Sequence, residues 1–381
     1  MRSAPAPRLA GFDGLRAVAA LAIFVYHFRI YVVVLPASSE MFDIWMQLRV
    51  GVWIFFVLSG FLLYRPYAAA RRDGRPGPAL RDYLRNRILR VYPAYAVALV
   101  LLTYVFHKTQ CQALGSFLVQ LGLLQIYDLS ELLKGIPVTW SLAVEVSFYA
   151  LLPLYAGMVA WASRRLAVVR AEALGLATLV ATGVAWQVAA RGHVLQSAWL
   201  PSFLPTFAVG IGLAVLLEHR PAAALRRARA LARHGLWCWV AAAAILAVKG
   251  LTQPTVGFDA GFAVVPQAIY ATVAALVVAP CALASSGATS ARVLEWRPLR
   301  AVGVASFALF LWHVSIIKSA QFEWIPLEDP VPGRNALVFV AALSVTLAVG
   351  FLSWYLVERP MLRIGRRSSS PLGSARASGS R

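Results

Sequence analysis

The sequence predicts an all-α polytopic membrane protein with about ten transmembrane helices and with both termini in the cytoplasm. Hydrophobic residues make up 60% of the 381 positions, charged residues make up only 14%, and the mean hydropathy is +0.69. A soluble domain does not need so much apolar surface, because its exterior faces water. Apolar runs of about 17–23 residues recur along the chain, and each is long enough to cross roughly 30 Å of hydrocarbon.

Ten of these apolar runs are expected to span the membrane. In chain order they are residues 12–34, 48–64, 91–107, 139–161, 172–190, 199–217, 235–251, 264–283, 301–318 and 336–357. A further apolar segment, residues 113–127, would invert every later loop if it crossed the membrane as well. We therefore expect it to be an interfacial or re-entrant element on the outer side.

The net charge of +20 follows this topology. With the N-terminus inside, 27 of the 36 Lys and Arg residues fall in inside segments, and eight lie outside or at outer helix ends. Cytoplasmic segments of membrane proteins carry such an excess of basic residues. The basicity therefore indicates topology and not nucleic-acid binding, and we expect a multi-pass protein of the cell (inner or plasma) membrane.

The chain is expected to form one membrane domain, residues 11–360, after a cytoplasmic N-terminus, residues 1–10. Residues 361–381 are rich in Ser, Arg and Gly and are expected to be a disordered cytoplasmic tail. The stretch "ALRDYLRNRILR", residues 79–90, alternates apolar residues with arginines and predicts an interfacial helix that leads into the third span. No soluble catalytic domain is recognised, so the chemistry is expected from the spans and their short loops.

The first span carries ionisable residues in an apolar helix. Asp13 and Arg16 open it, and His27 lies near its far end. An ionisable side chain at mid-bilayer costs roughly 2.5–3.5 kcal/mol and therefore indicates a functional or pairing role. Arg16 and His27 are three helical turns apart on one face, and Asp13 can pair with Arg16. Histidine titrates near neutrality, so His27 either acts as a base or simply bonds a neighbouring helix.

The third and fourth spans carry two more polar clusters. Ser141, Glu145 and Tyr149 follow each other at i+4 spacing and form one polar stripe. Glu145 therefore either faces a cavity or pairs with an arginine to join two helices. Arg87 and Arg90 are one turn apart and can converge on one anionic group, although arginines at this depth also contact lipid headgroups.

Two further segments carry candidate residues. In "GVWIFFVLSGFLLYRP", Gly51 and Gly60 bracket Ser59 and predict close helix packing. In "SFALFLWHVS", His313 lies towards the outer end of the ninth span. The three cysteines and six histidines show no metal-ligand spacing, so no metal is expected.

Six segments, which follow each other in the order typical of the family, resemble the acyltransferase-3 family of integral membrane O-acyltransferases. They are "FDGLRAVAALAIFVYHF", "GVWIFFVLSGFLL", "RILRVYPAY", "VTWSLAVEVSFYALLPL", "ASFALFLWH" and "SWYLVERP". The resemblance covers about residues 11–360 and indicates the stand-alone form, without an appended esterase-like domain. One position departs from the family pattern: in the ninth-span motif a tyrosine often follows the serine, and here Phe307 takes its place.

The resemblance implies transfer of an acyl group, acetyl or another short one, from acyl-CoA to a hydroxyl of a sugar-containing acceptor. His27 would be the base or a transient acyl carrier, and Arg87 and Arg90 would bind the coenzyme A phosphates. Arg16 would orient the surroundings of His27 or hold part of the acyl-CoA, and Glu145 would position the acceptor, orient an active-site partner or assist proton transfer. Further candidate site residues are Asp13, Ser59, Ser141, Tyr149 and His313. The implied partners are the lipid bilayer, acyl-CoA and the acceptor, without metal or nucleic acid.

Two questions stay open at this level. The acceptor could be an envelope polysaccharide, a lipid-linked sugar, peptidoglycan, or a sugar on a secreted secondary metabolite such as a macrolide. The alternative from another class is a multi-pass transporter or flippase of a glycan or lipid-linked sugar, which would use the same intramembrane charges as its pathway.

Overall fold

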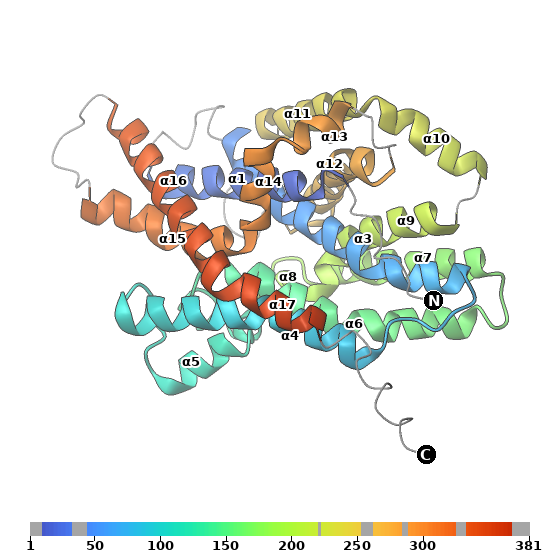
Figure 1. Cartoon of the computed structure of the whole chain (residues 1–381), viewed down its shortest axis with the longest axis horizontal. Coiled ribbons are helices and arrows are strands. Elements are labelled where there is room, and N and C mark those ends of the chain that lie inside the picture. Colours follow the sequence, from blue (N-terminus) through green and yellow to red (C-terminus); the bar gives the residue numbers. More distant parts are fainter. Residues whose placement is uncertain are drawn as a thin grey trace, which may run out of the picture.

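The computed structural model describes residues 10–32, 44–219, 222–252, 262–283, 289–324 and 333–367, and in this part of the chain there is no β-strand (Figure 1). The helices are α1 (Phe12–Tyr31), α3 (Gly51–Arg72), α4 (Leu80–Val100), α5 (Leu114–Leu121), α6 (Thr139–Ala162), α7 (Val168–Ala189), α8 (Val194–Ser197), α9 (Leu200–His219), α10 (Ala222–Arg233), α11 (Gly235–Thr252), α12 (Val264–Leu283), α13 (Thr289–Leu294), α14 (Arg297–Val304), α15 (Ser306–Ser319), α16 (Arg334–Ser353) and α17 (Arg359–Arg367).

Within the described residues, nine helical stretches are long and apolar enough to cross a membrane. They contain α1, α3, α4, α6, α7, α9, α11, α12 and α16. A tenth is formed if α14 and α15, which meet at an angle of 76°, count as one bent span. The predicted all-α polytopic class with about ten spans is therefore confirmed.

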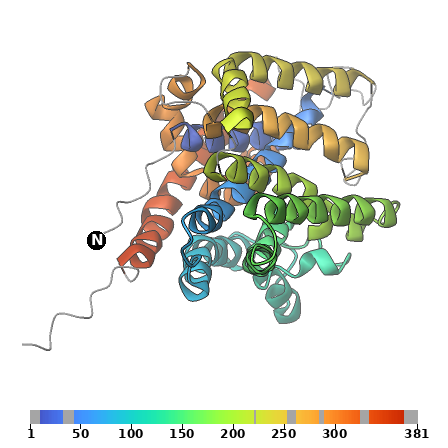
Figure 2. The same ribbon diagram turned by 90° about the vertical axis from the view of Figure 1, so that its right-hand side faces the viewer.

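Helix α3 lies inside the bundle and packs against α1, α6, α9 and α12. Figures 1 and 2 show α11 and α12 along one edge of the bundle and α5 along the opposite edge. Glycines allow the closest approaches: a Cβ atom on Gly60 would lie 2.4 Å from the carbonyl oxygen of Phe207, and one on Gly51 would lie 2.5 Å from that of Ala19. The close packing predicted for both glycines is confirmed.

The basic segment after the second span differs from expectation. Helix α3 continues to Arg72, eight residues beyond the expected end of the span, and α4 begins at Leu80. The segment expected as an interfacial helix is therefore the first part of α4, in one helix with the span that follows. The reason for the extension of α3 is that its last arginines have carboxylate partners on neighbouring helices, as described below.

Two other segments bear on the expected topology. Within residues 113–127, α5 has eight residues and is about 12 Å long, too short to cross the membrane. Helix α17 lies against α4 (Figure 1), so the first residues of the expected disordered tail are helical. The remainder of that tail, residues 368–381, and most of the expected cytoplasmic N-terminus, residues 1–9, lie outside the described residues.

Candidate active site

A cavity of about 80 Å³ lies between helices that are far apart in the sequence. One buried water needs roughly 10–15 Å³ on the same measure, so the cavity has room for a ligand group. Its polar lining residues are Arg16 of α1, Ser59 of α3, Arg87 and Arg90 of α4, Ser141, Glu145 and Tyr149 of α6, and Ser306 of α15. Seven of the ten candidate residues from the sequence therefore meet at one cavity.

Positively charged side chains outnumber negatively charged ones in the lining of this cavity. Arg16, Arg87 and Arg90 face a single carboxylate, Glu145, and in the described part of the chain none of the three arginines forms an ion pair within 4 Å. Glu145 accepts a hydrogen bond from the Ser59 hydroxyl. Cationic groups held in a low-dielectric interior need compensation, so this cavity favours an anionic ligand.

Aromatic and apolar side chains form the rest of the cavity wall. The Arg87 guanidinium lies over the Tyr149 ring, 5.8 Å from its centroid. Phe307, the position at which the sequence departs from the family pattern, lines the cavity next to Phe310. The cavity therefore combines a basic region with an apolar region, as an amphipathic ligand requires.

The two histidines singled out in the sequence contact each other. Nδ1 of His27 on α1 lies 3.1 Å from Nε2 of His313 on α15, and the two rings meet edge to face with centroids 4.9 Å apart. His313 is 2% exposed. Sequence reasoning proposed both residues separately and missed the pair, because they are 286 positions apart.

The hydrogen bonds of the pair assign its protons. Nδ1 of His313 lies 2.8 Å from the carbonyl oxygen of Phe310, and Nδ1 of His27 lies 3.0 Å from that of Ile23. A carbonyl oxygen only accepts, so both Nδ1 atoms carry the hydrogen when the rings are neutral. The single Nδ1–H of His27 is then shared between two acceptors, the carbonyl oxygen of Ile23 and Nε2 of His313. Nε2 of His27 is left with a lone pair, as a general base needs.

The histidine pair lies directly behind the cavity wall. Neither His27 nor His313 is among the cavity-lining residues, but Ile23 and Phe310, whose carbonyl groups bind the two rings, both line it. Asp13 lies outside the cavity as well, and the expected ion pair between Asp13 and Arg16 is not formed within the described residues. Instead, the backbone oxygen of Asp13 packs against Gly303, where a Cβ atom would lie 1.7 Å from it.

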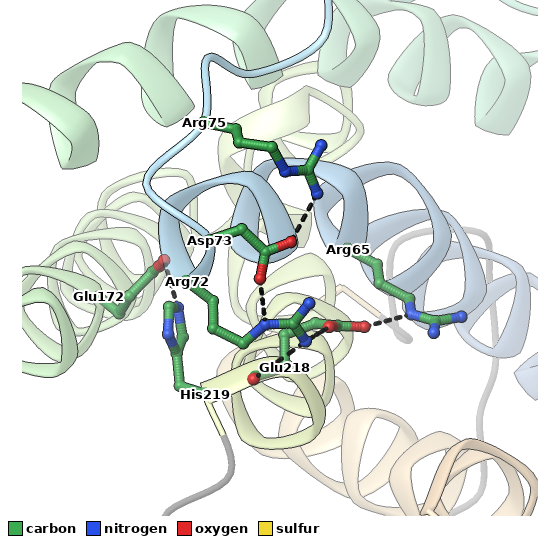
Figure 3. A network of polar contacts seen from close by, with 7 residues as sticks. All are labelled: Arg65, Arg72, Asp73, Arg75, Glu172, Glu218 and His219. Atoms are coloured by element: carbon green, nitrogen blue, oxygen red, sulfur yellow. Dashed lines mark hydrogen bonds and ion pairs between the residues drawn. The ribbon is translucent and has the colours of Figure 1, made fainter. Parts of the chain in front are cut away.

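A second charged region, which we call the network, joins α3 to α7 and α9 (Figure 3). Glu172 of α7 is fully buried and accepts hydrogen bonds from Tyr64 at 2.6 Å and from Arg71 Nε at 2.8 Å. His219 Nε2 lies 3.3 Å from the same carboxylate. Three helices are thus held by one buried acid.

The network continues at the end of α3. Glu218 of α9 accepts from Arg65 at 2.6 Å and from Arg72. Asp73, just beyond the span, accepts from Arg72 at 2.7 Å and from Arg75 at 2.5 Å (Figure 3). The pKa of Asp73 is lowered from 3.8 to about 2, mainly by the hydrogen bond from Arg72 and secondly by the one from Arg75. From the sequence, these arginines were interpreted only as signals of topology. Their pairing could have been predicted from Glu172 and Glu218, because each is an isolated acid at the edge of an apolar span.

The described part of the chain brings no three His, Cys, Asp or Glu side chains together as ligands for a metal ion. The sequence profile described as an acyltransferase domain matches residues 9–355. The chain belongs to the acyltransferase-3 family. The resemblance drawn from the six motifs is thereby confirmed.

Several named proteins are similar to this member of the family. Acyltransferase MdmB of Streptomyces mycarofaciens is 26% identical, over 94% of this chain and 93% of its own length. YrhL of Bacillus subtilis, named as a peptidoglycan O-acetyltransferase, is 27% identical, and O-acetyltransferase OatA of Staphylococcus aureus is 22% identical. The chain spans only 56% of YrhL and 58% of OatA. No solved structure matches significantly.

Proposed function

We propose that this protein is an O-acyltransferase that moves an acetyl or other short acyl group from acyl-CoA to a hydroxyl of a sugar-containing acceptor. The observation that carries the proposal is the cavity that Arg16, Arg87, Arg90 and Glu145 line together in a chain of the acyltransferase-3 family. Two similar proteins, YrhL and OatA, are named as O-acetyltransferases, which supports acetyl as the acyl group.

The cavity is proposed as the donor site. Arginine forks match phosphate oxygens in charge and geometry, so Arg87 and Arg90 would bind the phosphates of coenzyme A. The apolar part of the wall, with Phe307 and Phe310, would contact the uncharged arm that carries the thioester. The thioester would then have to pass Ile23 and Phe310 to meet His27.

His27 is proposed as the general base. Its Nε2 lone pair would accept the proton of the acceptor hydroxyl while the oxygen attacks the thioester carbonyl carbon. A new C–O bond forms, the C–S bond breaks, and the leaving thiolate takes the proton back from His27 as free coenzyme A. Arg16 would stabilise negative charge at the donor, and Glu145, held by Ser59, would orient an acceptor or a neighbouring side chain.

The acceptor is proposed to be a sugar hydroxyl. The name of YrhL points to peptidoglycan, whereas MdmB, the relative matched over nearly its whole length, is named only as an acyltransferase. We therefore propose either an envelope glycan or a glycosylated secondary metabolite such as a macrolide. The proposed orientation has both termini in the cytoplasm of a cell that carries the protein in its inner or plasma membrane.

The test is mass spectrometry of small metabolites and envelope glycans from cells that produce the wild type or His27→Ala. We expect one species to lose the mass of one acyl group in the variant, which names the acyl group and the acceptor together. A variant with unchanged acylation would contradict the proposal. A compound that instead changes its distribution across the membrane, with no acyl difference, would favour the transporter.

A further inference from the structure

We infer that His313 is a positioning residue for His27, and that its Nε2 atom orients the ring of His27 and stabilises that ring when it is protonated. The inference rests on the proposed function, in which His27 is the base. It assigns to His313 a role that neither the motif nor the family match specifies.

The first argument is geometric. The carbonyl of Ile23 lies on the same helix as His27, so it moves with His27 and cannot fix the ring relative to the rest of the site. His313 comes from α15, which packs against α1, and its Nε2 lies 3.1 Å from His27 Nδ1. Among the described residues, the hydrogen bond to His313 is therefore the one that ties His27 to another helix.

The second argument concerns the orientation of His313 itself. Its Nδ1 lies 2.8 Å from the carbonyl oxygen of Phe310 and 3.2 Å from that of Leu309, and the side chain is 2% exposed. A flipped ring would direct carbon at these carbonyl groups and would lose both contacts. His313 is thus held with Nε2 towards His27, before any substrate binds.

The third argument is chemical. When His27 Nε2 takes the proton of the acceptor hydroxyl, the ring becomes an imidazolium with hydrogens on both nitrogens. The hydrogen bond from His27 Nδ1 to His313 Nε2 then has a charged donor and becomes stronger. His27 returns the proton to the thiolate of coenzyme A, and His313 keeps its own proton throughout. His313 therefore acts on turnover and not on binding of the donor.

The test compares three variants with the wild type, purified in lipid nanodiscs. Acetyl-CoA is the donor, and the acceptors are a panel of methyl glycosides and an extract of the producing cells. In His313→Gln the side-chain oxygen reaches about as far as Nε2 and can still accept from His27. In His313→Asn the amide is equally polar but reaches only as far as Nδ1, and His313→Leu removes the acceptor altogether.

We expect His313→Leu and His313→Asn to lower kcat by about 10- to 100-fold, because each loses a hydrogen bond to a charged group, while KM for acetyl-CoA stays unchanged. His313→Gln should retain kcat within about threefold. Two results would overturn the inference but leave the proposed function standing. One is an equal kcat in the Gln and Asn variants, and the other is a wild-type kcat in the Leu variant while His27→Ala is inactive. No transfer by the wild type to any glycoside or cell extract would overturn the proposed function, and this inference with it.

A measurement on the wild type covers the case in which the variants do not fold. In protein labelled with ¹⁵N-histidine, NMR should find Nδ1 of His27 protonated and Nε2 of His313 unprotonated at neutral pH. The reverse protonation of either ring would exclude the proposed hydrogen bond.

Discussion

The cavity and the network use the same residue types in opposite ways. In the network, Arg65, Arg71 and Arg72 lie directly against Glu172 and Glu218, so the charges neutralise each other and tie three helices together. In the cavity, three arginines surround open space, with Glu145 as their one acidic neighbour in the lining. A buried arginine with a carboxylate partner is a structural element, whereas the arginines around the cavity are proposed to bind an anion from outside the chain.

The comparison predicts the largest effect at the histidine pair beside the cavity. His27→Ala should lower the rate of acyl transfer by about 10²- to 10⁴-fold, because a general base contributes that much to a rate. The readout is release of coenzyme A thiol from acetyl-CoA by purified protein. His219→Ala is the matched control, since it removes a histidine of the network, and it should leave the rate of the folded protein unchanged. An equal loss of rate in both variants would contradict the assignment of a catalytic role to His27 and a structural role to His219.

The next largest effect is expected at the donor end of the cavity. Arg87→Ala combined with Arg90→Ala should raise KM for acetyl-CoA by about 100-fold or more, because each arginine loses a hydrogen bond between charged groups. Steady-state kinetics over a range of donor concentrations measures it. Arg81→Ala is the control, because Arg81 is exposed on the same helix. If the double variant keeps the KM of the wild type, these arginines do not hold the donor.

In the network the expected effect is on stability and not on kinetics. Glu172→Gln leaves Arg71 buried without its charged partner and should cost about 3–5 kcal/mol of the free energy of unfolding. Thermal unfolding in detergent should show a lower Tm, with KM for acetyl-CoA unchanged at temperatures where the protein is folded. The pair of changes Glu172→Gln and Arg71→Gln should recover part of the loss, because no charge is then left alone. A further decrease in Tm would argue against the pairing.

The smallest effect is expected at the exposed edge of the network. Hydrogen bonds from Arg72 and Arg75 lower the pKa of Asp73 to about 2, so its contribution to stability is fully present above its ordinary pKa of 3.8 and is lost as the pH falls towards 2. Asp73→Asn should therefore lower Tm slightly and by the same amount from about pH 5 to 8. The difference should shrink below about pH 4 in unfolding curves, and a difference that grows there would contradict the ion pairs.

Much of the fold was predictable because its signals are local. Hydropathy along the chain predicted ten spans, and the structure has nine long apolar helices plus the bent pair α14 and α15 in its described residues. The polar stripe of Ser141, Glu145 and Tyr149 follows from 3.6 residues per turn, and all three line one cavity. The end of α3 was misjudged because hydropathy falls at Arg65, while the helix continues to where its arginines are paired.

The sequence by itself determined the membrane class, the family and most of the residues that meet at the cavity. Only the tertiary structure decided which charges neutralise each other, which face the cavity, and that His27 contacts His313. The physical reason is that composition and periodicity act over one helix, whereas a side chain's partner depends on how helices distant in the sequence are rotated and packed against each other. Arg71 and Arg87 look alike as residues in a basic segment, and the helices around them make one a structural tie and the other part of a candidate binding site.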